Sequence, residues 1–131
     1  MKSLFCLLPA LIVLLTSLQT GHAETKVMTP KVNHRSEPVG IESGRPVFRW
    51  NLEDTERNTF QQSYRLTTAS HPALLGKTPD FWDSGWVDSN ECVEVEYAGK
   101  TLSPSRRYYW NVQVRNHRGQ VSSLFRPASF V

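Results

Sequence analysis

Residues 102–114 read LSPSRRYYWNVQV, and from residue 108 onward every second residue is large and apolar. The residues that share this parity are Tyr108, Trp110, Val112 and Val114. Such alternation is typical of a strand with one buried face. A tyrosine at the entry of the strand is the pattern of a β-sandwich corner, where the tyrosine hydroxyl bonds to backbone just upstream. The stretch therefore predicts a sandwich strand that begins at Tyr108.

Other segments with strand character recur at regular spacing. Residues 47–52 (VFRWNL) and 61–70 (QQSYRLTTAS) alternate in the same way. Residues 91–97 (ECVEVEY) also alternate, which places Cys92 on the polar face of that strand. Residues 123–131 read as an edge or broken strand, because Pro127 cannot donate a backbone hydrogen bond to a ladder.

Two connecting segments carry turn chemistry. Residues 70–76 (SHPALLG) combine a capping residue, a proline and a final glycine, which predicts one helical turn. Residues 83–85 (Asp-Ser-Gly) predict a turn between Trp82 and Trp86.

These patterns predict an all-β chain: an immunoglobulin-like or fibronectin type III β-sandwich of about seven strands, preceded by a signal peptide. The expected domains are residues 1–23 as signal peptide, 24–37 as linker or edge strand, and 38–131 as the sandwich. The parity of the strands predicts a core formed by Phe48, Trp50, Tyr64, Leu66, Val95, Tyr97, Tyr108, Trp110 and Val112.

The N-terminus predicts export to the periplasm or the extracellular space. Lys2 precedes an apolar stretch at residues 4–18, and residues 21–23 (Gly-His-Ala) offer small side chains at the positions that a signal peptidase reads. The alternative is an uncleaved membrane anchor, but the apolar run is shorter than the roughly 20 residues that span a bilayer. We therefore expect cleavage before Glu24, loss of Cys6 with the leader, and no transmembrane segment in the mature chain.

The charge balance does not favour a nucleic-acid partner. Without Lys2 the chain holds 14 basic and 12 acidic side chains, a formal charge of +2, and its arginines are scattered. Nucleic-acid binding normally needs a concentrated basic face. Arg106 and Arg107 lie beside two tyrosines, an arrangement that can bind single strands, but the strand pattern already explains these aromatics.

Residues that could carry chemistry are sparse. The histidines after the leader occur singly, and no His or Cys spacing suits a metal, so we expect no metal, no cofactor and no catalytic residue. Asp83 and Asp88 could form a pair of carboxylates for glycoside hydrolysis, but such a pair needs a deep site. Cys92 is flanked by carboxylates, which raise a thiol pKa, so we expect it to be inert.

Several motifs in order resemble a known family. They are Pro38-Val39-Gly40-Ile41, Arg45-Pro46-x-Phe48-x-Trp50, Gln62-x-Tyr64-Arg65-Leu66, Phe81-Trp82-Asp83-Ser84-Gly85, Val95-x-Tyr97-Ala98-Gly99-x-x-Leu102 and Arg107-Tyr108-Tyr109-Trp110-x-Val112-x-Val114. Together they are similar to the N-terminal fibronectin-type-III-like domain of bacterial α-L-rhamnosidases, which are inverting glycoside hydrolases.

The resemblance implies a non-catalytic scaffold module in a secreted enzyme that degrades rhamnose-containing glycans. Its partners would be the jelly-roll domain and the catalytic (α/α)₆ barrel that follow the sandwich in that family. The matching residues are fold residues, so no catalytic position is carried over to this chain. The alternative is a free-standing secreted module that binds carbohydrate or protein. For that alternative, Trp82 and Trp86 are the candidate sugar contacts.

Overall fold

The computed structural model describes residues 25–41 and 44–131, and the predicted signal peptide lies outside them. The described chain is nearly all β-strand, with a single turn of 3₁₀ helix between β3 and β4. The elements are β1 (Thr25–Val32), β2 (Val47–Asp54), β3 (Gln61–Ala69), η3 (Pro72–Leu74), β4 (Trp82–Asp83), β5 (Val87–Asp88), β6 (Val95–Glu96), β7 (Tyr108–Asn116) and β8 (Ala128–Phe130).

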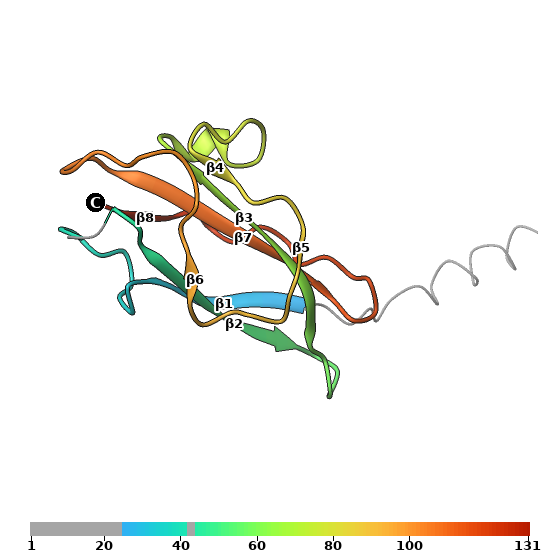
Figure 1. The fold of residues 1–131 in the computed structure, drawn as a ribbon. Coiled ribbons are helices and arrows are strands. Elements are labelled where there is room, and N and C mark those ends of the chain that lie inside the picture. Colours follow the sequence, from blue (N-terminus) through green and yellow to red (C-terminus); the bar gives the residue numbers. More distant parts are fainter. Residues whose placement is uncertain (1–24, 42–43) are drawn as a thin grey trace, which may run out of the picture.

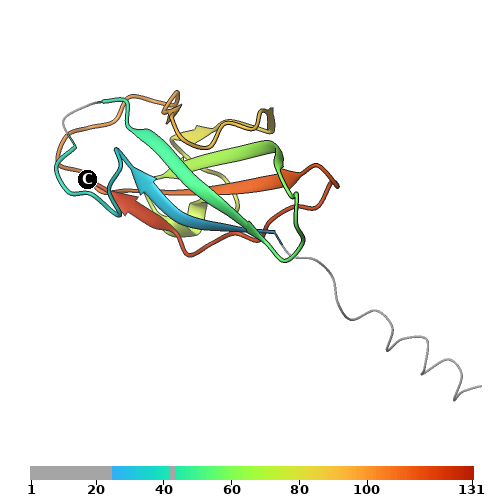
Figure 2. The ribbon, with the colours of Figure 1, turned by 90° about the horizontal axis from the view of Figure 1, so that it is seen from below.

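Two antiparallel sheets pack face to face, as Figures 1 and 2 show. One sheet has the order β1-β2-β6, and the other has the order β4-β3-β7-β8, with β5 also paired to β3. The β3–β7 pair forms the centre of the larger sheet, with a ladder that runs from Gln61 opposite Asn116 to Ala69 opposite Tyr109. This arrangement is the immunoglobulin-like sandwich that the alternating strands predict.

The core lies between the sheets and follows the parity seen in the sequence. Tyr108, Trp110, Val112 and Val114 of β7 are almost fully buried and face the apolar residues of β2. Within the core, the Phe48 and Trp110 rings lie 4.6 Å apart between centroids. All the residues that the sequence analysis assigns to the core are buried: Phe48, Trp50, Tyr64, Leu66, Val95, Tyr97, Tyr108, Trp110 and Val112.

Tyr108 forms the corner that the sequence predicts. Its hydroxyl accepts a 2.8 Å hydrogen bond from the backbone N–H of Ser103, five residues upstream. Its ring packs edge-on against Phe81 at 4.9 Å and lies 5.6 Å from Phe130. The tyrosine therefore fixes the connection before β7 to the start of that strand.

The polar position predicted for Cys92 is wrong. Cys92 is half-buried and packs against the core, whereas Val93, which shares the parity of Val95 and Tyr97, is 42% exposed. The alternation fails because β6 is only two residues long, and the backbone before it turns. The Cys92 carbonyl accepts a hydrogen bond from the Trp50 N–H, and the Glu91 carboxylate accepts one from the Val93 N–H. These bonds redirect the side chains before the strand begins.

The first and last strands lie at sheet edges. β1 belongs to the range that the sequence gives as a linker or an edge strand, and its register with β2 shifts between Met28 and Lys31. β8 begins only after Pro127, and Val131 beyond it bonds with backbone groups of Pro38, Gly40 and Ile41. No helix in the described part of the chain has the length and apolar character needed to cross a bilayer.

Candidate functional site

Trp82, one of the two candidate sugar contacts, packs against the core. Its ring lies 5.3 Å from the Tyr97 ring in an edge-on arrangement and 6.2 Å from the Phe48 ring. Gly99 lies so close that a Cβ there would be 2.4 Å from the Trp82 Cβ. Trp82 therefore closes the edge of the sandwich, and its ring is engaged by neighbouring residues.

Trp86, the other candidate, lies under a cation. The Arg115 guanidinium carbon is 4.3 Å from the centre of the Trp86 ring, which is a close cation–π contact. Trp82 and Trp86 thus contact different partners, and the structure does not join them into one aromatic platform. A sugar stacked on the Arg115 side of Trp86 would first have to displace the guanidinium.

The carboxylates next to these tryptophans have structural partners. Asp83 accepts two hydrogen bonds from Arg65, at 3.0 Å from Nε and 2.6 Å from Nη2, and one from the Gly85 N–H at 3.0 Å. The Arg65 hydrogen bonds hold the pKa of the Asp83 carboxyl below its ordinary value. A general acid needs the opposite shift. Asp83 therefore stabilises the turn, which Gly85 completes with a positive φ of 63°.

A second carboxylate lies at the end of the sandwich where β1 begins. Asp54 accepts a short hydrogen bond from the Thr25 hydroxyl and one of 3.3 Å from Arg118. The Thr25 bond is the main reason why the pKa of Asp54 is lowered. Buried Asn116 donates to the same Thr25 hydroxyl at 2.8 Å. This network joins β1 to the ends of β2 and β7.

Cys92 has the character of a structural thiol. Burial raises its pKa, and the negative charge of Glu91 adds to the rise. A high pKa leaves little thiolate at neutral pH, and the thiolate is the nucleophilic and metal-binding form. Among residues 25–41 and 44–131, no group of three His, Cys, Asp or Glu side chains is arranged to hold a metal ion.

The basic pair before β7 is engaged within the sandwich. The Arg106 guanidinium lies 5.9 Å from the Phe81 ring and 6.0 Å from the Tyr108 ring. Arg107 donates a 2.9 Å hydrogen bond to the Ser129 hydroxyl on β8. These arginines therefore pack on the aromatic rings at the start of β7 and bond to β8. The Arg-Arg-Tyr-Tyr sequence thus has a structural explanation.

Phe60 is an aromatic residue that the sequence analysis does not single out. It lies between the charged loop after β2 and the start of β3, and it is 56% exposed. The signal in the sequence is an aromatic residue at a strand entry. Phe60 has the same parity as Tyr64 and Leu66, but the register of β3 with β7 shifts between Gln61 and Ser63, so the alternation does not extend to Phe60. In the part of the chain that the structure describes, Phe60 is the only exposed Phe, Tyr or Trp.

The family described as the Rha78A-like, N-terminal immunoglobulin domain matches residues 27–131, from within β1 to the end of the chain. The chain belongs to this family. The resemblance drawn from the ordered motifs is thereby confirmed.

Relatives of this N-terminal immunoglobulin domain are α-L-rhamnosidases. The Streptomyces avermitilis enzyme is 35% identical over 103 residues, which cover 79% of this chain and 10% of the relative. A Formosa agariphila α-L-rhamnosidase is 33% identical over 132 residues, covering 98% of this chain and 14% of the relative. This immunoglobulin domain therefore spans only 10–14% of the length of these relatives.

Solved structures agree with the sequence comparisons. The crystal structure of the S. avermitilis α-L-rhamnosidase complexed with L-rhamnose matches with a TM-score of 0.78 at 34% identity, over 81% of this chain and 10% of that chain. The α-L-rhamnosidase structure from Dictyoglumus thermophilum matches with a TM-score of 0.76 at 29% identity, over 80% of this chain and 12% of that chain. The immunoglobulin domain thus shares its fold with a small part of each enzyme.

Proposed function

We propose that this chain is the N-terminal immunoglobulin-like module of an exported α-L-rhamnosidase, in which it acts as a non-catalytic scaffold for the jelly-roll and catalytic domains. The observation that carries the proposal is the family match over residues 27–131, combined with a length that is only 10–14% of the related rhamnosidases. The glycan acted on by the whole enzyme would contain terminal rhamnose.

The state of the carboxylates supports a non-catalytic role. Glycoside hydrolysis uses two carboxyl groups that flank the scissile bond, one of them with a raised pKa so that it can act as an acid. In this domain, hydrogen bonds from Arg65 lower the pKa of Asp83, and a hydrogen bond from Thr25 lowers the pKa of Asp54. Both side chains already hold the fold together, so neither is suited to protonate a leaving group.

The position of β1 is compatible with export and cleavage after Ala23. β1 begins at Thr25, which is 3% exposed and hydrogen-bonded to Asn116 and Asp54. Cleavage before Glu24 would leave this strand whole. Cleavage a few residues later would remove Thr25 and with it the hydrogen bonds to Asn116 and Asp54. Mass spectrometry of the exported product tests the junction, and a first residue beyond Thr25 would contradict the proposed cleavage.

Activity assays test the scaffold role directly. We expect that the chain alone does not hydrolyse an aryl α-L-rhamnoside. The longer gene product that contains the chain should hydrolyse it. Turnover by the chain alone that survives purification would overturn the non-catalytic role. A gene product that stops after Val131, with the mass of residues 24–131, would overturn its place in a larger enzyme.

A further inference from the structure

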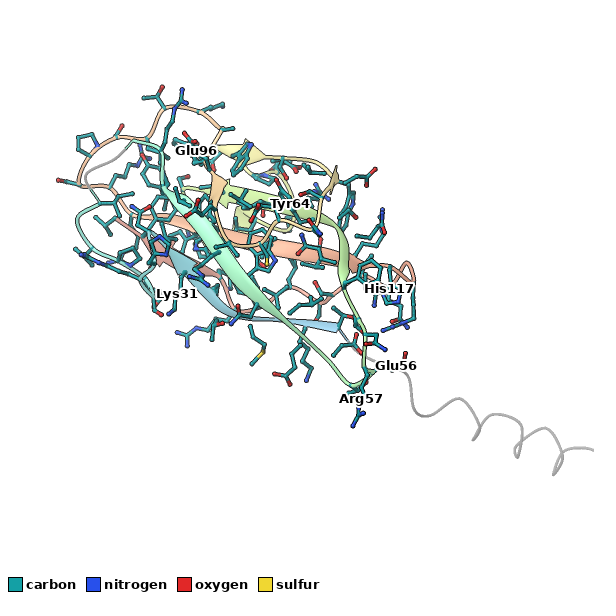
Figure 3. All side chains as sticks on the ribbon, turned by 60° about the horizontal axis from the view of Figure 1, so that its bottom comes forward. Lys31, Glu56, Arg57, Tyr64, Glu96 and His117 are labelled. Atoms are coloured by element: carbon teal, nitrogen blue, oxygen red, sulfur yellow. The ribbon has the colours of Figure 1, made fainter. Side chains whose placement is uncertain are left out.

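Phe60 is held rigidly in its exposed position. Its ring stacks on the His117 imidazole with centroids 4.2 Å apart and planes 7° from parallel. The backbone N–H of His117 donates to the Phe60 carbonyl at 3.1 Å, and the backbone N–H of Phe60 donates to the imidazole Nδ1 of His117 at 3.4 Å. Figure 3 shows His117 at the end of the sandwich where Glu56 and Arg57 also lie. Phe60 is 56% exposed although His117 covers one face of its ring, so the other face of the ring is open.

A hollow of about 260 Å³ lies beside this ring. It is lined by Phe60, Gln61, Gln62, Asp88, Ser89 and Asn90. The Gln61 side chain fixes the shape of the hollow, because its amide donates to the Ser89 and Glu91 carbonyls at 2.9 and 2.8 Å. Its oxygen accepts a 3.0 Å bond from the Trp50 indole in the core. The Gln61 side chain thereby links the start of β3 to the segment that contains Ser89 and Glu91.

The rim of the hollow presents polar groups that are free to bind. The side chains of Gln62, Asp88 and Asn90 are exposed and make no hydrogen bond to the described residues. An amide offers both donors and acceptors, and an ionised carboxylate offers acceptors only. Asp88 is the one charged residue in the lining, so the hollow disfavours anions. The combination suits a neutral ligand with an apolar face and several hydroxyl groups.

We propose that the hollow beside Phe60 is a sugar-binding subsite for a pyranose ring of the glycan. The C–H face of the sugar stacks on the open face of Phe60, and its hydroxyls bond to Gln62, Asp88 and Asn90. The choice of rhamnose as the sugar rests on the proposed function, whereas the aromatic ring and its polar rim are observed in the chain itself. The subsite replaces Trp82 and Trp86 as the candidate sugar contact, because those rings are occupied by Tyr97 and Arg115.

Titration of the ¹⁵N-labelled protein with L-rhamnose tests the proposal by NMR. One stacked ring and a few exposed hydrogen bonds predict a dissociation constant of the order of 1 mM or weaker. We expect saturable shifts of the amide signals of Phe60, Gln62, Asn90 and His117. Phe60→Leu, which keeps an apolar side chain but removes the ring, should weaken binding about tenfold, equivalent to about 1.4 kcal/mol. Phe60→Tyr should retain it.

The control is Leu124→Ala, which removes another exposed apolar side chain, 47% exposed, away from the hollow. It should leave the affinity unchanged, and Asn90→Ala should weaken it without altering the fold. Absence of saturable shifts, equal binding by Phe60→Leu, or preference for a quaternary ammonium cation such as choline would overturn the sugar subsite. None of these results would restore or remove the proposed scaffold role, which the activity assays test separately.

Discussion

Gly99 lies against the edge of the core, where a larger residue has no room. A Cβ at this position would lie 2.5 Å from the Tyr97 hydroxyl and 2.6 Å from the Phe81 carbonyl oxygen. Because one of these atoms belongs to the backbone, Gly99→Ala should destabilise the fold by about 1–3 kcal/mol through overpacking. Gly76→Ala is the matched control, since its nearest neighbour would be a Leu124 methyl at 3.9 Å. Urea denaturation measures both, and equal midpoints would contradict the prediction.

Single residues also show where sequence reasoning succeeds. Tyr108 and Trp110 could be placed in the core because every second residue of β7 from Tyr108 to Val114 is large and apolar. Cys92 could not, because its orientation depends on a local turn, in which the Val93 N–H bonds to the Glu91 carboxylate, and on a long-range bond from the Trp50 N–H. Phe60 was missed for a related reason. Its stacking partner His117 is distant in the sequence, so the exposed pair becomes visible only in the folded chain.

The joint between β1, β2 and β7 depends on Asn116. Its amide donates to the Thr25 hydroxyl at 2.8 Å, and its oxygen accepts from the backbone N–H groups of Arg118 and Gln120 at 2.9 and 3.0 Å. Asn116→Ala would remove these three bonds from a fully buried position, so we expect a loss of about 1–3 kcal/mol in the free energy of unfolding. The exposed Asn51, whose side-chain amide donates to the Thr29 hydroxyl, is the control. Hydrogen exchange should speed up in β1 in Asn116→Ala alone; unchanged exchange would contradict this role.

Long elements were more predictable than short ones. The segments that became β2, β3 and β7 alternate over enough residues to define a buried face. By contrast, β4, β5 and β6 are two residues each, and partner strands and side-chain bonds determine their positions. The Arg65–Asp83 pair illustrates this, since it fixes β4 against β3 by a contact between residues 18 positions apart. No local pattern in the sequence reveals such a pair.

The molecule as a whole should lose stability at high pH. Burial, with a smaller contribution from Tyr108, raises the pKa of Tyr97 to about 12. In the unfolded chain the same hydroxyl titrates near 10. Its contribution is therefore present in full below pH 10 and is lost between about pH 10 and 12, by about 2–3 kcal/mol. Melting temperatures from pH 8 to 11 should fall less steeply in Tyr97→Phe; parallel curves would argue against this cause.

The two ends of the described chain lie at opposite ends of the long axis of the sandwich (Figures 1 and 2). β1 is paired along its length to β2, and the backbone of Val131 is bonded to Pro38, Gly40 and Ile41. A force that pulled the two ends apart would therefore act nearly parallel to the strands. Bonds that run perpendicular to the strands would then be sheared together, not opened one after another. We therefore expect the sandwich to resist tension along its long axis.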